Sequence, residues 1–299
     1  MNTSLLAGTL LFLAVCPATG TAQSDPAAPA PAPRTEYLRL YFPVGQTLYY
    51  SLTEDTIGTS LEAHGKPTRI NSHLEMHLHQ TVTGLQASDS AGLIEIGIDS
   101  LTVTVDKKPT PPTDSDLAAM ADMVKLVVLP NGKLESALVN PALNVSEALT
   151  GEDPAHLNAL AGLGVLPETP LKVGDTWKSP VFQGMEGEQT TADLTLTGWE
   201  KQGAASIAVI KQALHGKFGT PAADTAQPPG ELKIAGGEFG TRTVRFNVEA
   251  GTVQSEESLV YLNAVLTTCI EQHPPTTTRM WVKVTSKMVQ TDAPPPKTP

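Results

Sequence analysis

The chain has 299 residues, and its 20 Lys and Arg against 31 Asp and Glu give a formal net charge of −11 at pH 7. This acidic balance argues against nucleic-acid binding, which depends on clustered basic side chains that neutralise phosphates. A mean hydropathy of −0.08 excludes a protein built from many membrane-spanning helices. The length suits one large domain or two ordinary ones.

Residues 1–22 have the pattern of an export signal. Leu5 to Val15 form an apolar stretch of roughly eleven residues, shorter than the ~20 that a spanning helix needs. Small residues follow at Gly20 and Ala22, which predicts cleavage after Ala22. The alternative is an uncleaved anchor. The pattern predicts an exported protein, either periplasmic or extracellular.

Cys16 offers a second outcome for this segment. Leu13-Ala14-Val15-Cys16 resembles a bacterial lipoprotein box, although Val15 stands where a smaller residue is usual. Lipidation at Cys16 would anchor the protein, and only then do we expect membrane contact. Residues 23–36 are rich in Pro and Ala and predict a disordered tether, and residues 291–299 predict a disordered tail.

The first half, residues 37–139, is dominated by alternation of apolar and polar residues, which is typical of half-buried strands. Asn131-Gly132 predicts a hairpin turn, because both residues accept positive φ. The pattern predicts strands at Tyr37–Phe42, Thr47–Ile57, Ile70–Leu85, Gly92–Asp106, Lys125–Leu129 and Lys133–Glu135.

Helical spacing occurs in two places only. Asp116–Met123 carries apolar residues on one face, and residues 140–169 predict a helical connector with a Pro-led start at Asp153-Pro154. The second half, residues 170–290, returns to strands. They are predicted at Thr176–Phe182, Ala192–Glu200, Ala204–Phe218, Phe239–Glu249, Thr252–Leu266 and Thr277–Gln290.

These elements predict a mainly β fold in which antiparallel meanders form curved sheets, as a half-barrel or a sandwich, with short connecting helices. The halves also share short motifs. Val44-Gly45-Gln46-Thr47 matches Val173-Gly174-Asp175-Thr176, and the turn at Gly132 matches the turn at Gly251. The matches indicate two pseudo-repeats of one β unit.

The same motifs carry a resemblance to a known family. Pro43 to Thr47, the turn from Leu129 to Lys133, and Pro170 to Trp177 with its V-G-D-T-W sequence resemble an uncharacterised family of secreted bacterial β-rich proteins. The resemblance covers most of the chain after the signal. It implies export and a β-rich architecture, and it supplies no catalytic residues.

The strongest candidate for a metal site is the segment His73-Leu74-Glu75-Met76-His77-Leu78-His79. On a strand, His73, His77 and His79 share one face with Glu75, while the leucines and methionine take the other. Imidazoles two residues apart can hold Zn²⁺ or Cu²⁺ if a neighbouring strand adds a ligand. The simpler interpretation is the polar face of a half-buried strand, with no cofactor.

Other candidate residues have structural interpretations. We interpret Trp177, Trp199 and Trp281 as core residues rather than an aromatic binding patch. The adjacent pairs Glu54-Asp55 and Glu256-Glu257 point to opposite faces of a strand, so we interpret them as solvated charges rather than acid–base couples. The usual hydrolase, nucleotide and metalloprotease motifs do not occur.

The preferred interpretation is an exported, non-enzymatic β-rich protein of the periplasm or cell envelope, which binds a lipid-like ligand or a partner protein on a concave sheet. Two alternatives stay open. One is an exported metal-dependent hydrolase built on the His-rich strand. The other is a structural envelope protein whose partner is another protein.

Overall fold

The computed structural model describes residues 34–62, 65–86, 90–109, 112–113, 120, 124–139, 164–180, 191–218, 232–268 and 276–294. These residues form twelve strands. They are β1 Thr47–Glu62, β2 Thr68–Gln86, β3 Ala91–Val105, β4 Lys108–Pro109, β5 Val124–Val128, β6 Leu134–Val139, β7 Thr176–Pro180, β8 Thr191–Gln202, β9 Ala205–Phe218, β10 Leu232–Asn247, β11 Thr252–Thr268 and β12 Thr276–Thr291.

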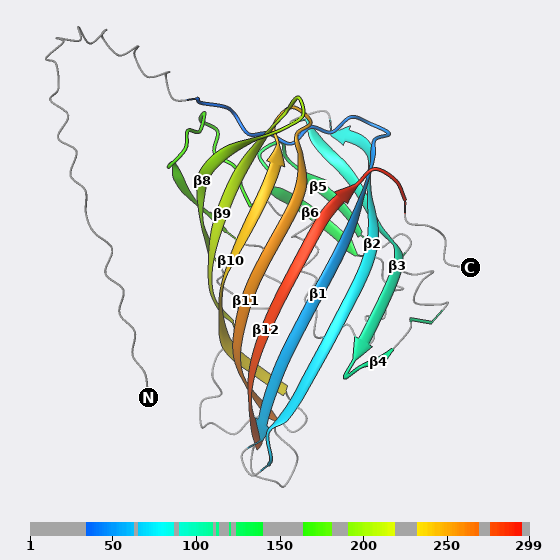
Figure 1. Ribbon diagram of the computed structural model, residues 1–299, viewed down its shortest axis with the longest axis vertical. Helices are drawn as coiled ribbons and strands as arrows, with labels where there is room; N and C mark the ends of the chain where they lie inside the picture. Colours follow the sequence, from blue (N-terminus) through cyan, green and yellow to red (C-terminus); the bar gives the residue numbers. More distant parts are fainter. Residues whose placement is uncertain are drawn as a thin grey trace, which may run out of the picture. The chain divides into compact units, whose positions relative to one another are not determined.

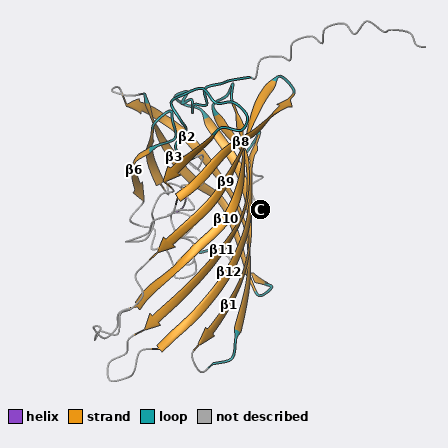
Figure 2. Cartoon of the chain, turned by 90° about the vertical axis from the view of Figure 1, so that its left-hand side faces the viewer, coloured by secondary structure: helices purple, strands orange, loops and turns teal. Residues whose placement is uncertain are grey.

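All twelve strands belong to one antiparallel sheet, in which the order is β6-β5-β3-β2-β1-β12-β11-β10-β9-β8-β7 and β4 pairs with β3 (Figure 1). Two meanders, β1 to β6 and β7 to β12, join where β1 pairs with β12 over a long register. The sheet is open, with β6 and β7 as its edges, and it curves strongly (Figure 2). The mainly β, antiparallel fold class is therefore confirmed, as a single curved sheet.

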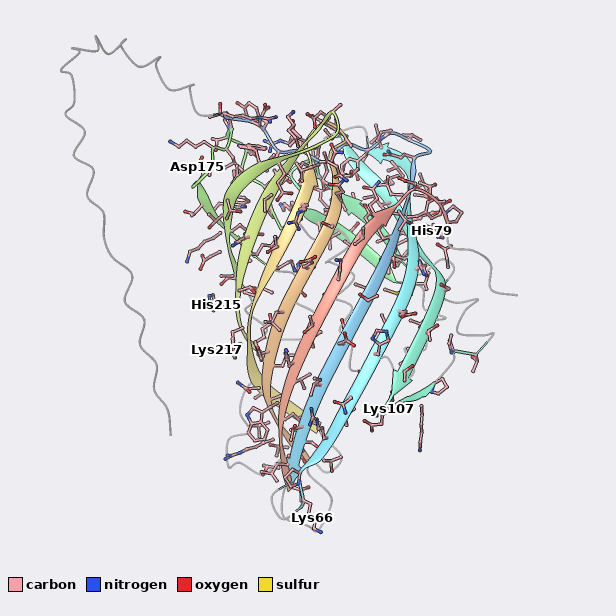
Figure 3. The ribbon with its side chains drawn as sticks, in the orientation of Figure 1. Lys66, His79, Lys107, Asp175, His215 and Lys217 are labelled. Carbon is pink, nitrogen blue, oxygen red and sulfur yellow. The ribbon has the colours of Figure 1, made fainter. Side chains whose placement is uncertain are left out.

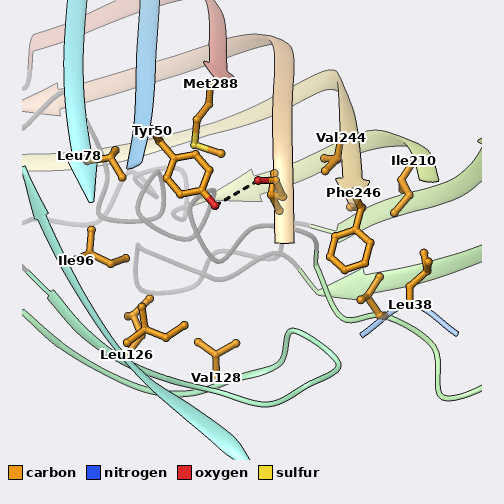
Figure 4. Close-up of a cluster of buried hydrophobic side chains, with 14 of the residues drawn as sticks. Leu38, Tyr50, Leu78, Ile96, Leu126, Val128, Ile210, Val244, Phe246 and Met288 are labelled. Carbon is orange, nitrogen blue, oxygen red and sulfur yellow. Dashed lines mark hydrogen bonds between the residues drawn. The ribbon is translucent and has the colours of Figure 1, made fainter. Parts of the chain in front are cut away.

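The alternation seen in the sequence sets two faces of the sheet. On β2 and β3, for example, Leu78 and Ile98 are opposite one another on the buried face, and His79 and Gly97 on the other. We call the buried, concave side the inner face and the other the outer face. The core on the inner face joins residues of β2, β3 and β5 to residues of β8, β9 and β10 (Figure 4).

The core lies toward one end of the sheet, which residues 34–46 cover; we call this segment the plug and this end the plugged end. Leu40 N donates to Pro130 O and Tyr41 N donates to Gly251 O, so the plug bonds to the tips of two hairpins. Leu38 is buried in the core. The opposite end, at the β1–β2 connection and the start of β12, is called the distal end.

The prediction of a strand at Tyr37–Phe42 is wrong. The residues alternate as expected, with Leu38 buried and Tyr37 and Tyr41 exposed. However, the segment crosses the ends of strands rather than lying beside one, so its backbone bonds go to turns. Alternation of apolar and polar residues indicates that one side of a segment is buried. It does not indicate whether the segment pairs with a neighbouring strand.

The two V-G-x-T motifs make the same turn. Gly45 and Gly174 both have positive φ, which glycine adopts without strain. In the first turn Gly45 N donates to Val82 O, and in the second Gly174 N donates to Leu196 O, each at 2.8 Å. A β-bulge follows each acceptor, between Val82 and Gly84 in β2 and between Leu196 and Gly198 in β8. The motifs of the two halves therefore occupy equivalent places in the sheet.

The other strand predictions agree with the structure to within a few residues, except at one start. β10 begins at Leu232, seven residues before the predicted Phe239. The predicted signal, most of the tether, Cys16, most of the helical segments 116–123 and 140–169, and residues 295–299 lie outside the described residues.

Candidate functional site

The His-rich segment lies on β2 with the predicted orientation. Leu74 and Leu78 are buried on the inner face, and the histidines lie on the outer face. His73 is directly opposite Asp55 of β1, and its Nδ1 lies 2.8 Å from Asp55 Oδ1. Its Nε2 lies 3.2 Å from Glu75 Oε1. These two hydrogen bonds, with Asp55 the larger contributor, raise the pKa of the His73 imidazole above its ordinary value.

The three histidines do not converge on one point. His79 Nδ1 lies 2.9 Å from Asp99 Oδ1, beside the β-bulge in the pairing of β2 with β3 (Figure 3). His73 and His77 are four residues apart on an extended strand, or about 13 Å. Within the described ranges, no three His, Cys, Asp or Glu side chains gather closely enough to hold a metal ion. The Zn²⁺ or Cu²⁺ site at these residues stays a prediction.

A hollow of about 470 Å³ lies on the outer face beside His73. Its walls come from β1, β2, β12 and the turn after β3, and they include Asp55, Asn71, Lys107 and Lys283. The size suits a small molecule. The hollow is open to solvent, and polar and charged residues stand among the groups that line it.

The inner face carries the feature that stands out chemically, a row of polar side chains across an apolar surface. The register makes its members successive cross-strand neighbours from β9 to β1. We call this row the inner polar rung; its members are Gln212, Arg242, Ser258, Ser286 and Glu54. Ser258 Oγ and Ser286 Oγ are hydrogen-bonded at 2.7 Å.

Glu256 of β11 lies diagonally next to this rung and pairs with it. Arg242 Nε is 2.9 Å from Glu256 Oε1, and the two side chains are only 14% and 5% exposed. Burial raises the pKa of the Glu256 carboxyl, and the Arg242 guanidinium partly offsets that rise. Glu256 Oε2 and Arg242 Nε are both buried, and neither has a hydrogen-bond partner. The pair therefore leaves one acceptor oxygen and one donor nitrogen unsatisfied on the inner side of the sheet.

Glu54 adds a second carboxylate to the same surface. It is 7% exposed, and its Oε1 accepts a hydrogen bond from Thr56 Oγ1 at 3.0 Å. The interpretation of Glu54 and Glu256 as solvated charges is therefore wrong, although each does point away from its exposed neighbour, Asp55 or Glu257. The sequence contained a signal, because Glu54 shares the alternation phase of Tyr50 and of other apolar residues of β1.

Toward the distal end, the inner face below the rung is mostly apolar and only half covered, and it includes Glu238 of β10, opposite Leu262. Val260, Leu262 and Val282 are partly buried there, and Ile70 is 44% exposed. From Ser258 to Leu266 this surface runs about 26 Å along β11 at ~3.3 Å per residue. The structure thus combines a long apolar strip with buried carboxylates at one end of it.

The plugged end holds a much smaller cavity, of about 40 Å³, lined by residues of the plug, β1 to β3 and β11. That volume has room for a water molecule or two. Tyr50 OH donates to Val253 O at 3.3 Å, and burial raises the pKa of the Tyr50 phenol. Gln46 lines the cavity, and its Oε1 is buried without a partner. This region is a packed core that contains one small cavity beside a buried polar side chain.

The three tryptophans differ in their surroundings. Trp177 and Trp199 are partly buried against the core, as predicted, and Trp177 Nε1 donates to Val165 O at 3.0 Å. Trp281 is 44% exposed on the outer face, so the prediction that it is a core residue is wrong. Its neighbours across the sheet are Asn263 and Thr59, which offer no apolar cover.

No protein-family model matches the chain, and no curated protein matches it significantly. Among solved structures, a chain of lipovitellin, studied for lipid–protein interactions, is 12% identical with a TM-score of 0.48; the alignment covers 87% of this chain and 27% of that one. OccK5 from Pseudomonas aeruginosa is 8% identical, covering 82% and 98%, with a TM-score of 0.23. A LolA superfamily protein from Nitrosomonas europaea is 9% identical, covering 83% and 87%, with a TM-score of 0.13.

The chain therefore spans about a quarter of the lipovitellin chain that it matches. With TM-scores below 0.5, these similarities carry no information about function. Within the described part of it, no helix has the length and hydrophobicity that crossing a lipid bilayer requires.

Proposed function

We propose that this protein is an exported, non-catalytic binding protein of the cell envelope, which holds a neutral amphiphile on the inner face of its sheet. The acyl part of the ligand lies along the apolar strip between the inner polar rung and the distal end. A head group that carries hydroxyl or amine donors reaches the rung. The buried, unpartnered Glu256 Oε2 is the observation that carries this proposal.

The chemistry of the rung specifies the head group. A buried carboxylate oxygen without a partner is costly, and a ligand that donates a hydrogen bond to it removes that cost. The inner face here carries two carboxylates, Glu54 and Glu256, and one arginine, Arg242, so an anionic head group is repelled and a donor-bearing one is favoured. The strip of about 26 Å is long enough for an extended acyl chain of common length.

Export is the second part of the proposal, and it is supported by the sequence of residues 1–22. Mass measurement of the mature protein tests it. A chain that begins at Gln23 supports a soluble exported form, and a lipid-modified Cys16 at the new N-terminus supports an anchored one. An unprocessed chain that stays in the cytosol contradicts export.

Ligand binding is tested with two probes that share an oleoyl chain. The full-length protein is loaded with the apolar dye N-phenyl-1-naphthylamine, and the dye is displaced by 1-monooleoylglycerol or by methyl oleate. We expect 1-monooleoylglycerol, with its two hydroxyls, to displace the dye at a concentration on the order of tenfold lower, since one net hydrogen bond to a charged group is worth about 1.5 kcal/mol.

The matched variants use two ion pairs on neighbouring positions of the sheet. Arg242→Met with Glu256→Met removes the inner pair, and Lys287→Met with Glu257→Met removes an outer pair whose atoms lie 3.3 Å apart. The inner double variant should bind both probes equally, while the outer one keeps the preference. Failure of both probes to displace the dye, or a preference that survives the inner double variant, contradicts the proposed site.

A further inference from the structure

The outer face near the distal end exposes aromatic and aliphatic side chains. Phe239 of β10 and Tyr261 of β11 are directly opposite each other, and their rings stack with centroids 5.1 Å apart. Trp281 lies on β12, one rung closer to the distal end. We call this surface the distal outer patch; its exposed large hydrophobic residues are Ile57, Phe239, Tyr261, Val265 and Trp281.

Basic side chains surround and interrupt the patch. Lys283 lies on the rung of Tyr261 and Ile57, Arg279 lies opposite Val265, and Lys217 follows on β9 (Figure 3). Lys66 and Arg69 extend the series to the β1–β2 connection. All five cations are exposed, and none has a carboxylate partner in the described structure. From the rung of Ile57 to the distal end, the described outer positions of β1, β2 and β9 to β12 carry no carboxylate, and Asp106, in the turn after β3, accepts a hydrogen bond from Asn71 N.

The rungs nearer the plugged end have a different charge pattern. There, outer cations alternate with carboxylates and form ion pairs across the strands, as in Lys125–Glu95 at 2.8 Å and Arg245–Glu200 at 3.1 Å. In a chain of net charge −11, the distal outer patch thus combines several unpaired cations with exposed aromatic rings, while Lys211 is an unpaired outer cation nearer the plugged end.

We propose that the distal outer patch docks on the surface of an anionic lipid bilayer. Tyr and Trp favour the boundary between head groups and acyl chains, and Lys and Arg are attracted to anionic head groups. An outer sheet face that presents both kinds of side chain therefore suits an anionic bilayer surface. The inference is independent of the inner-face ligand, because the two surfaces lie on opposite sides of the sheet.

The experiment measures co-sedimentation of the full-length protein with vesicles of phosphatidylcholine and phosphatidylglycerol in equal parts, and with phosphatidylcholine alone. The distal variant carries Lys217→Gln, Arg279→Gln and Lys283→Gln. Its control carries Lys178→Gln, Arg245→Gln and Lys287→Gln, three outer cations that are ion-paired. Each triple variant changes the net charge by the same three units, so general repulsion from the vesicle changes equally.

We expect the wild type to bind the anionic vesicles and the distal variant to bind on the order of a hundredfold more weakly, because each cation contributes about fivefold. The control variant should lose much less. Trp281 emission should shift to shorter wavelength on anionic vesicles, and Trp281→Phe should abolish that change. Added salt should release the protein.

Three results would overturn the proposal. The first is equal affinity of the wild type for the two kinds of vesicle. The second is equal loss of binding in both triple variants, with unchanged unfolding midpoints showing that both are folded. The third is retention by single-stranded DNA, or self-association through the patch, without binding to vesicles.

Discussion

The two ends of this sheet differ in how completely their inner face is covered. At the plugged end, residues 34–46 close the inner face, the core is continuous, and outer charges are paired across strands. Toward the distal end, inner apolar residues are half covered, while outer aromatic rings and cations face solvent. Strands β1, β2 and β9 to β12 run through both regions, and the plug closes only one of them, so the difference lies in what covers the inner face and in the side chains of the shared strands.

This comparison assigns separate tasks to the two ends. Stability is concentrated where the plug, the hairpin tips and the core meet, because burial of apolar area is the main favourable contribution to folding. Side chains at the distal end bury little apolar area, so we expect substitutions there to cost little stability. Substitutions that place the same change in both regions test this division.

The largest contrast is expected between two phenylalanines of β10. Phe246 is fully buried in the core, and Phe239 is 48% exposed on the distal outer patch. Phe246→Ala should lower the free energy of unfolding by about 3–5 kcal/mol, while Phe239→Ala should cost less than about 1 kcal/mol. Urea denaturation of both variants measures the difference, and equal losses would contradict the division.

The buried pair on the inner face should respond to single and double substitution in opposite ways. Arg242→Met leaves Glu256 buried without a cation and should cost about 3 kcal/mol. Arg242→Met with Glu256→Met should recover most of that loss, since an apolar pair of similar size needs no compensation. A double variant as unstable as the single one would show that the pair itself holds the sheet together.

Gly251 tests the contact between the plug and the second half. Its φ is +64°, and an added Cβ would lie 2.6 Å from Tyr41 N. Gly203 has φ +60° with open space around it. Both Gly→Ala changes carry backbone strain of about 1 kcal/mol, and Gly251→Ala should cost roughly 1–2 kcal/mol more because the plug must move. Thermal unfolding of the two variants gives the difference.

The smallest expected effect concerns the outer face of β2. The raised pKa of His73 means that its protonated form is favoured in the folded state. Its contribution is therefore present below the unfolded value near 6.5 and is lost as pH rises through the raised folded pKa. His73→Asn should cost a few tenths of a kcal/mol at about pH 6 and nothing at about pH 9. A difference that grows with pH would reverse the assignment.

Much of the fold could be predicted because strand alternation has a period of two and the turns use glycine. Gly45, Gly132 and Gly174 all have the positive φ that their positions in the sequence suggested. The sequence does not predict the start of β10, because Gly236 and Gly237 lower the strand signal. The alternation of the plug predicts a strand, although it reflects burial against the core and not pairing.

The site was less predictable, since a rung belongs to five strands and becomes visible only when the register is known. Gln212, Arg242 and Glu54 are far apart in the sequence and are brought together by pairing. Each is a polar residue at a position where the alternation of its strand places apolar residues. This signal can be read from the sequence, but only for one strand at a time. Trp281 shows the converse, because an aromatic residue in the outward phase was assigned to the core by residue type alone.

The central position of β12 has a consequence for how the protein is made. Among the described strands, the ladder between β1 and β12 is the one that pairs the two meanders. During synthesis, neither half can be joined to the other until residues 276–291 have left the ribosome. Long-range pairing of this kind is slow, so the ladder between the two meanders forms late in folding. A stop codon before β12 would therefore remove the ladder that joins the two half-sheets and leave β1 and β11 with unpaired edges.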